Sequence, residues 1–180
     1  MPPPDAEAAI KRSFAPVVDD ETRLLLLGSL PGEESLAQLR YYAHPRNQFW
    51  LLMGAVIGRD LTPLDYPDRL HALLGAGVGL WDVVESASRR GSLDAAIRNH
   101  QPNRLAELAA SLPKLAAIGF NGNTAARIGH AQLAGQSDLS LLTLPSSSPA
   151  FTIPLADKRL RWLELRPWLA ECRKNKFTLH

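Results

Sequence analysis

Four short apolar runs, each closed by small or polar residues, restrict the fold of this chain more than any other feature. They are TRLLLLGS, GVGLWDVV, KLAAIGF and LSLLTLP. Runs of four to eight apolar residues bounded by glycine, proline or serine are typical of strands buried on both faces. Helical stretches separate the runs, so the sequence predicts a mostly parallel sheet that is covered by helices on both faces.

The helical stretches carry start and stop signals. Asn47 is a candidate N-cap, as are Ser92 and Asn103 for later segments. Pro167 is expected to kink the closing helix, because proline removes a backbone donor. Helices are predicted over residues 47–58, 66–77, 103–113, 121–135 and 154–172.

Polar or glycine-rich residues follow every predicted strand. The stretches are GSLPGEES, WDVVESASRRGS, GFNGNTA and LPSSSPA. In open parallel sheets, ligands bind outside the carboxyl ends of the strands. The four stretches should therefore meet around one crevice, and this convergence is the strongest functional signal that comes from the residues alone.

Composition limits the class of protein. The chain has 180 residues, a formal net charge of +2 and one cysteine, Cys172, which excludes an intramolecular disulfide and a cysteine-based zinc site. No apolar run approaches the length of a membrane span, and no secretory signal begins the chain. We expect a partly ordered lead-in over 1–20, a single domain over 21–180, and a reducing, cytoplasmic setting.

Several common active-site motifs can be excluded. GAGVG precedes its strand instead of following it, and GSLPGEES lacks the lysine of a phosphate-binding loop. Ser29 does not lie in a Gly-x-Ser-x-Gly nucleophile turn. The five histidines are scattered, with no pair at helical spacing, so we expect no metal site.

The hydroxyl and basic groups near the strand ends suit a phosphate backbone. Ser146, Ser147 and Ser148 lie between two prolines, where hydroxyls and backbone N–H groups can bind phosphate oxygens. Arg89 and Arg90 follow the second strand, and Lys158 lies in the basic DKRLR cluster. A plain Ser/Pro turn and a solvated helix face are the alternative interpretations of these two patterns.

Asn121 and Asp82 each end a predicted strand, and each has two interpretations. Asn121 could cap the following helix, or its carboxamide could read a base edge with one donor and one acceptor. Asp82 could cap the next turn, or its carboxylate could face the crevice.

Taken in order, the motifs resemble those of the uracil-DNA glycosylase superfamily. The stretches are LLLLGSLPGEESL, YYAHPRNQFW, GVGLWDVVESASRRGSLDAAI, IGFNG and LPSSSPA, spanning Leu24 to Trp162. Within the superfamily they are most similar to the hypoxanthine-DNA (deoxyinosine) glycosylases. The resemblance implies a three-layer α/β/α sandwich with a central parallel four-stranded sheet. It also implies a monomeric enzyme that hydrolyses the N-glycosidic bond of a deaminated base in DNA, without metal or cofactor.

This sequence departs from the superfamily at one position. The first motif normally carries a polar residue that places the attacking water, and here that position holds Leu30. The resemblance suggests Asn47 as the replacement, and it suggests that Tyr42 stacks on the flipped base. Gly28 and Ser29, in the first motif, are expected beside that base.

The resemblance and the residue chemistry together assign the remaining roles. Asn121 would read the base edge, and hypoxanthine, uracil or xanthine could be the substrate. His44 is a candidate donor to the departing base, and Asp82 is an alternative to Asn47 for activating water. If the amide of Asn47 instead caps its own helix, its assignment as the water holder weakens. A non-catalytic nucleic-acid binder and a small-molecule enzyme that uses the same crevice remain open alternatives.

Overall fold

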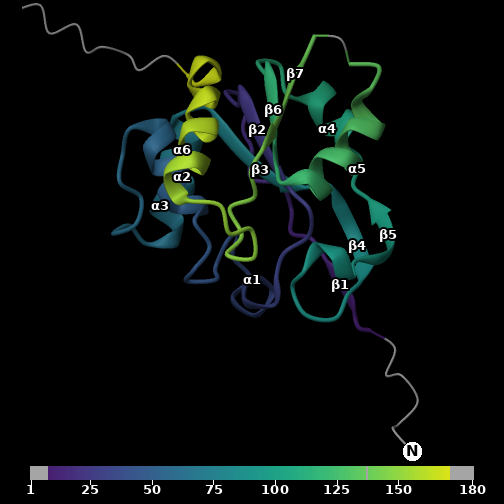
Figure 1. Cartoon of the computed structure of the whole chain (residues 1–180). Helices are drawn as coiled ribbons and strands as arrows, with labels where there is room; N and C mark the ends of the chain where they lie inside the picture. Colours follow the sequence, from purple (N-terminus) through teal and green to yellow (C-terminus); the bar gives the residue numbers. More distant parts are fainter. Residues whose placement is uncertain (1–7, 137, 171–180) are drawn as a thin grey trace, which may run out of the picture.

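A parallel four-stranded sheet forms the centre of the computed structural model, which describes residues 8–136 and 138–170 (Figure 1). Its strands, in spatial order, are β3 (Val78–Asp82), β2 (Leu24–Gly28), β6 (Ala117–Asn121) and β7 (Ser140–Leu144). Each neighbouring pair runs parallel, so all four strands end at the same edge. The four predicted apolar runs are therefore confirmed as the four strands of this sheet.

Helices cover both faces of the sheet, which confirms the predicted three-layer α/β/α architecture. In Figure 1, α2 (Phe49–Ile57), α3 (Tyr66–Gly75) and α6 (Leu155–Trp162) lie on one side, and α4 (Leu105–Ser111) and α5 (Asn123–Leu133) on the other. Alternate residues of β2 pack into different layers, because successive strand side chains point to opposite faces. Leu24 and Leu26 contact the first group, while Leu25 and Leu27 contact the second, and all four are fully buried.

A second, three-stranded antiparallel sheet was not predicted. It consists of β1 (Ile10–Arg12), β4 (Val84–Ser88) and β5 (Arg98–Pro102), with β4 in the middle. The run GVGLWDVV thus contributes to two strands instead of one, since the chain leaves the parallel sheet at Val83. The antiparallel sheet places residues 89–97, the β4–β5 connection, beside the carboxyl ends of the parallel strands.

Three predicted helix signals were wrong. Ser92 opens no α-helix, because the chain forms only the 3-10 turn η1 (Asp94–Ala96) before β5. The amide of Asn103 does not cap α4, since it donates to the Asp82 carbonyl and to Ser13 Oγ. The closing helix ends at Trp162 and continues as the 3-10 segment η2 (Leu163–Trp168), which contains Pro167.

Residues 10–17, within the predicted lead-in, pack against the domain. Besides forming β1, they accept hydrogen bonds from the Trp81 indole, at the Phe14 carbonyl, and from the Tyr41 hydroxyl, at the Ala15 carbonyl. Cys172 lies outside the described residues. Among the helices that the structure describes, none is long and apolar enough to span a bilayer.

Candidate active site

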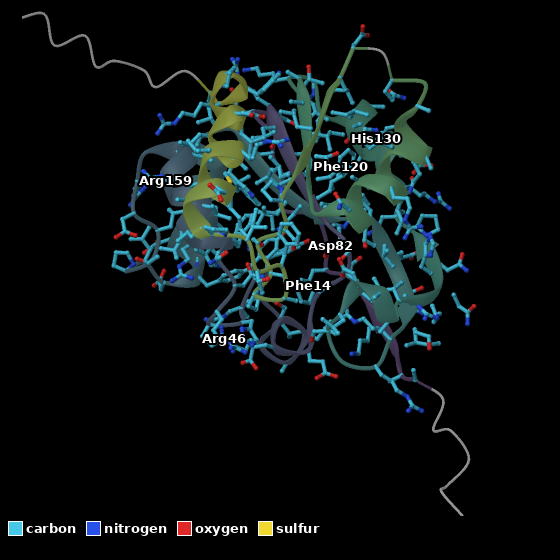
Figure 2. The ribbon with its side chains drawn as sticks, viewed as in Figure 1. Phe14, Arg46, Asp82, Phe120, His130 and Arg159 are labelled. Carbon is cyan, nitrogen blue, oxygen red and sulfur yellow. The ribbon has the colours of Figure 1, made fainter. Side chains whose placement is uncertain are left out.

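A cleft of about 570 Å³ opens at the carboxyl ends of the four parallel strands. The polar stretches that follow the strands meet there, as the sequence predicts. Figure 2 shows Asp82 near the middle of the molecule, whereas Arg46 and Arg159 lie at its periphery. The cleft is lined by residues 28–35, 41, 42, 44, 47, 82, 92–94, 121 and 146–151.

Asp82 ends β3 and is only 4% exposed. Its Oδ2 atom is buried and has no hydrogen-bond partner. Burial, and secondarily the negative charge of Asp94, raise the pKa of Asp82 to about 7, although Arg89 opposes the shift. A carboxyl group with a pKa near neutrality and an unpaired oxygen in a cleft is suited to accept a proton.

Gly28 leaves room for the polar groups of Asp82 and Tyr42. A Cβ at this position would lie 2.6 Å from Asp82 Oδ1 and 3.1 Å from the hydroxyl oxygen of Tyr42. The Tyr42 hydroxyl is also buried without a hydrogen-bond partner. Burial and the charge of Asp82 raise the pKa of Tyr42, so the phenol keeps its proton. Any side chain larger than glycine would displace one of these two groups.

The ring of Tyr42 is held in a defined orientation. It stacks on Phe49 with 3.8 Å between ring centroids and 12° between ring planes. Its backbone has a φ of +53°, a conformation that is uncommon for a non-glycine residue. The Trp50 indole donates to the Tyr42 carbonyl at 3.2 Å and helps to fix this turn. One face of the ring is covered by Phe49, and the side chain lines the cleft.

Ser147 connects the two asparagines that were predicted to act on the substrate. Asn121 donates from Nδ2 to Ser147 Oγ at 2.9 Å, and its Oδ1 accepts from the Ser147 N–H at 2.8 Å. One N–H and one lone pair of the Asn121 amide are therefore engaged by Ser147. A second N–H and a second lone pair remain on the amide, and its role in reading a base edge stays a prediction. Ser147 Oγ in turn donates to Asn47 Oδ1 at 2.8 Å.

Asn47 uses its oxygen to hold the entry of α2. Besides the bond from Ser147, Oδ1 accepts from the Phe49 N–H at 3.0 Å, so the amide does cap its helix, while Gln48 occupies the N-cap position itself. An oxygen with two donors has little capacity left to orient water. The NH₂ group is the end of Asn47 that is left for the cleft, and it is a donor.

His44 is exposed, and one hydrogen bond indicates the tautomer of its neutral ring. Nδ1 accepts a hydrogen bond from the Arg46 N–H at 3.1 Å, so a neutral ring carries its proton on Nε2. The ring lines the cleft. His44 therefore has Nε2–H as its donor, and its predicted role toward a departing base stays a prediction.

Comparisons with known proteins identify the family of the chain. Residues 15–169 match the family model of the uracil DNA glycosylase superfamily. The chain belongs to the uracil DNA glycosylase superfamily. Among its relatives is a hypoxanthine DNA glycosylase of Methanosarcina barkeri, 43% identical over 112 residues, which cover 62% of this chain and 71% of the relative. A hypoxanthine DNA glycosylase of Methanosarcina acetivorans is 40% identical over 141 residues, or 78% of this chain and 88% of the relative.

A solved structure shows that the chain also shares its fold with a candidate member of the family. The solution NMR structure of a candidate uracil DNA glycosylase from Methanosarcina acetivorans superimposes with a TM-score of 0.80. It is 37% identical and covers 89% of this chain and 99% of its own. The resemblance inferred from the motifs is therefore confirmed for both the family and the fold.

The serine loop of this superfamily member does not present three equivalent hydroxyls. Ser147 is 1% exposed and is committed to the two asparagines, so it cannot contact phosphate through its side chain. Ser146 and Ser148 are half-buried and line the cleft. Their hydroxyls accept from the N–H groups of Ser148 and Ala150, respectively. Only these two hydroxyls remain candidates for a backbone contact.

Two of the predicted phosphate-binding cations are buried. Arg89 is 1% exposed, and its guanidinium donates to the carbonyls of Leu30, Pro31 and Gly91, so it holds the first-motif turn. Lys158 is likewise 1% exposed. The structure contradicts direct phosphate contacts for these two side chains because neither reaches the surface. Arg90 is exposed and stays a prediction.

The ammonium group of Lys158 supports the serine loop. It donates to Gln48 Oε1 at 2.9 Å and to the Ser148 carbonyl at 3.3 Å. These bonds tie α6 to the loop and to the entry of α2. Lys158 therefore shapes the cleft without entering it.

Asp94 was not predicted to belong to the site. Its Oδ1 accepts from Ser29 Oγ at 2.6 Å, so it joins the β4–β5 connection to the first-motif turn. Burial raises the pKa of Asp94, while the bond from Ser29 and the charge of Arg89 oppose the shift. A polar residue within SLDAAI could have been chosen only with the antiparallel sheet already known.

Proposed function

We propose that the protein is a monofunctional DNA glycosylase that hydrolyses the N-glycosidic bond of a flipped, deaminated base in base excision repair. Hypoxanthine is the proposed substrate, with uracil and xanthine as further candidates. The partnerless carboxylate oxygen of Asp82, at the floor of a strand-end cleft, is the observation that carries this proposal. The names of the two Methanosarcina relatives support the choice of hypoxanthine.

A single nucleobase would enter the cleft after leaving the base stack. Chemistry at a glycosidic bond inside a duplex requires this extrusion. A volume of about 570 Å³ lies within the range of small-ligand sites. Tyr42, supported from behind by Phe49, would stack on the base, a contact that contributes roughly 1–3 kcal/mol per base in single-strand binders.

Asp82 would hold the attacking water and accept its proton. The C1′–N bond of the nucleotide breaks, and the water oxygen forms a new bond to C1′. One water proton passes to the Asp82 carboxylate, which later returns it to solvent. This assignment replaces Asn47 as the water holder, because the Asn47 oxygen already accepts two hydrogen bonds.

Asn47 and His44 would stabilise the departing base. The bond electrons stay with the base, which leaves as an anion and takes up a proton from solvent. Donors that are fixed before the reaction stabilise such a charge most effectively. The Asn47 NH₂ and the His44 Nε2–H are donors of this kind, and Asn121 acts indirectly by holding Ser147 against Asn47.

An oligonucleotide assay tests the proposal. Matched oligonucleotides that carry one hypoxanthine, uracil or xanthine, single-stranded or in duplex, would be incubated with the protein and then treated with hot alkali. Strand cleavage at the lesion is the expected outcome, and the relative rates would rank the three bases. Binding without cleavage would instead support a non-catalytic nucleic-acid binder, an alternative that the apolar, buried Leu30 of the first motif favours. No binding would refute both.

A further inference from the structure

A second crevice, of about 460 Å³, adjoins the strand-end cleft. The two cavities share Tyr41, Tyr42, His44 and Asn47 in their linings, so they lie against the same stretch of chain. The remaining walls of the second crevice come from the end of α1 (Glu33–Gln38), from α2 and α3, and from the connection between those two helices. Its volume lies within the range of small-ligand sites, yet the mechanism proposed above places no group there.

The wall that α2 and α3 form is aromatic and held in place. Trp50 is buried and Tyr66 is half-buried, and both line the crevice. The guanidinium of Arg69 lies 5.2 Å from the centroid of the Trp50 ring, and it donates to backbone carbonyls of residues 61–64. These bonds fix the α2–α3 connection to α3. The wall therefore does not have to be ordered when a ligand binds.

Arg40 is an exposed cation at the same crevice. Its guanidinium lies 5.4 Å from the centroid of the Tyr66 ring, and the ion pairs of the described part of the chain do not include it. Among the described residues, one carboxylate, that of Asp65, lines the crevice beside Arg40 and Arg69. Its Oδ1 accepts from the Asp68 N–H at 3.1 Å and so caps α3. The balance of charge favours an anionic ligand.

The backbone around Arg40 has an uncommon conformation. Leu39 has a φ of +54° and Tyr42 a φ of +53°, left-handed values that are rare for side chains of this size. The Tyr41 N–H donates to the Tyr66 hydroxyl at 3.0 Å, which ties this turn to α3. Such conformations persist where the surrounding structure imposes them, and they cluster at ligand sites. Here the turn places Arg40 at the second crevice and Tyr42 in the lining of both cavities.

We propose that the second crevice binds the nucleotide next to the extruded one in a single strand of DNA. Arg40 contacts the phosphate of this neighbour, and its base enters the crevice beside Tyr66. Guanidinium groups suit phosphates, and aromatic side chains suit unstacked bases of any sequence. This inference rests on the proposed glycosylase function and names the form of its substrate. A neighbour in a single strand has no pairing partner to leave, so the contact belongs to single strands.

Strands that lack the neighbouring base test the inference. A single strand with one hypoxanthine would be compared with two strands that carry a tetrahydrofuran abasic residue on its 5′ or its 3′ side. We expect one of these two strands to bind about tenfold more weakly by fluorescence anisotropy, as the loss of one stacked base predicts. The KM for excision should rise by the same factor, with little change in kcat, because the contact lies away from the reacting bond. The same strands in duplex should show no such loss.

Arg40→Gln is the matching change in the protein. It should weaken binding of the intact single strand and reduce the slope of log affinity against log salt concentration by about 0.7, the effect of one lost phosphate contact. The effect of the missing base should also shrink in this variant, because the neighbour is no longer anchored in the crevice. Arg59→Gln is the control. Arg59 is exposed and lines neither cavity, so both the slope and the effect of the missing base should stay at parent values.

The outcomes separate the crevice from the chemistry. If both abasic strands bind and react like the intact strand, the crevice holds no neighbouring nucleotide and the inference is overturned. It is also overturned if Arg40→Gln weakens intact and abasic strands equally, since Arg40 then contacts the strand elsewhere, or if Arg59→Gln reduces the salt slope as much. Affinity is measured without catalysis. A parent protein that shows the abasic effect on binding but releases no base would refute the glycosylase proposal, and the crevice would remain a nucleotide site.

Discussion

Asp82→Asn should slow base release strongly and, at the same time, stabilise the fold in a pH-dependent way. The pKa of Asp82 is 3.8 in the unfolded chain and about 7 in the folded protein. Between these two pH values the folded protein keeps the proton, whereas the unfolded chain has released it. Its stabilising contribution is complete below pH 3.8 and is lost as the pH rises through about 7. Linkage then predicts that the free energy of unfolding of the parent falls, relative to the variant, by about 2 to 3 kcal/mol between pH 5 and pH 8.

Urea denaturation of both proteins at several pH values measures this difference. The comparison across pH cancels the fixed cost of placing an amide in the site. Asp20→Asn is the matched control for the substitution itself, because Asp20 is exposed and lies outside the cleft. If the difference in free energy of unfolding between the parent and Asp82→Asn does not change with pH, the claim that burial raises the pKa of Asp82 is refuted.

The activity of the same variant tests the mechanism. A lost general base reduces a rate by about 10²- to 10⁴-fold, which alkaline cleavage of a hypoxanthine oligonucleotide can measure. The parent rate should rise about tenfold per pH unit below pH 7 and then level off, because the ionised form of Asp82 is the one that accepts the proton. If the Asp82→Asn enzyme has near-parental turnover, Asp82 is not the general base, and another group activates the water.

Three further predictions concern the supporting network. Asn47→Ala should fold, lose about 1 kcal/mol of stability with its cap and release hypoxanthine about 10²-fold more slowly, as measured by denaturation and single-turnover cleavage. Ser147→Ala should lower the free energy of unfolding by about 1–3 kcal/mol, more than Ser146→Ala, because its hydroxyl is buried and bonded to two amides. Arg89→Met should lower the melting temperature but leave the salt dependence of duplex binding unchanged, since a buried side chain neutralises no phosphate.

The parallel sheet could be predicted because its strands are buried on both faces. Such strands must be continuously apolar, and the LLLL run that becomes β2 is an unambiguous case. The antiparallel sheet gave no comparable signal. The residues of β5, RNHQP, are all exposed and show no apolar alternation, so only pairing with β4 makes them a strand.

The members of the candidate site could also be predicted, but not their roles. Strand ends placed Asp82 and Asn121 in one cleft, and the resemblance added Tyr42 and Asn47. Which atoms of the two amides are already bonded depends on Ser147, whose partners lie 26 and 100 residues away in the chain. Sequence spacing carries no information about such bonds. Buried cations such as Arg89 present the same difficulty, because surface and buried arginines look alike in a sequence.

The apolar Leu30 and the partnerless Asp82 are best understood together. Leu30 offers no side-chain acceptor at the position where the superfamily normally places water, and the nearby Asn47 oxygen is engaged by its own helix and by Ser147. A carboxylate at the end of β3 can supply the acceptor, and its apolar surroundings raise its pKa toward the pH at which a base works best. The same desolvation destabilises the folded protein above neutrality. Glycine at position 28 leaves room for both Asp82 and the Tyr42 hydroxyl, so the fold accommodates this buried carboxyl group instead of filling the space with a side chain. We therefore infer that the destabilising carboxylate is retained for the chemistry of the cleft.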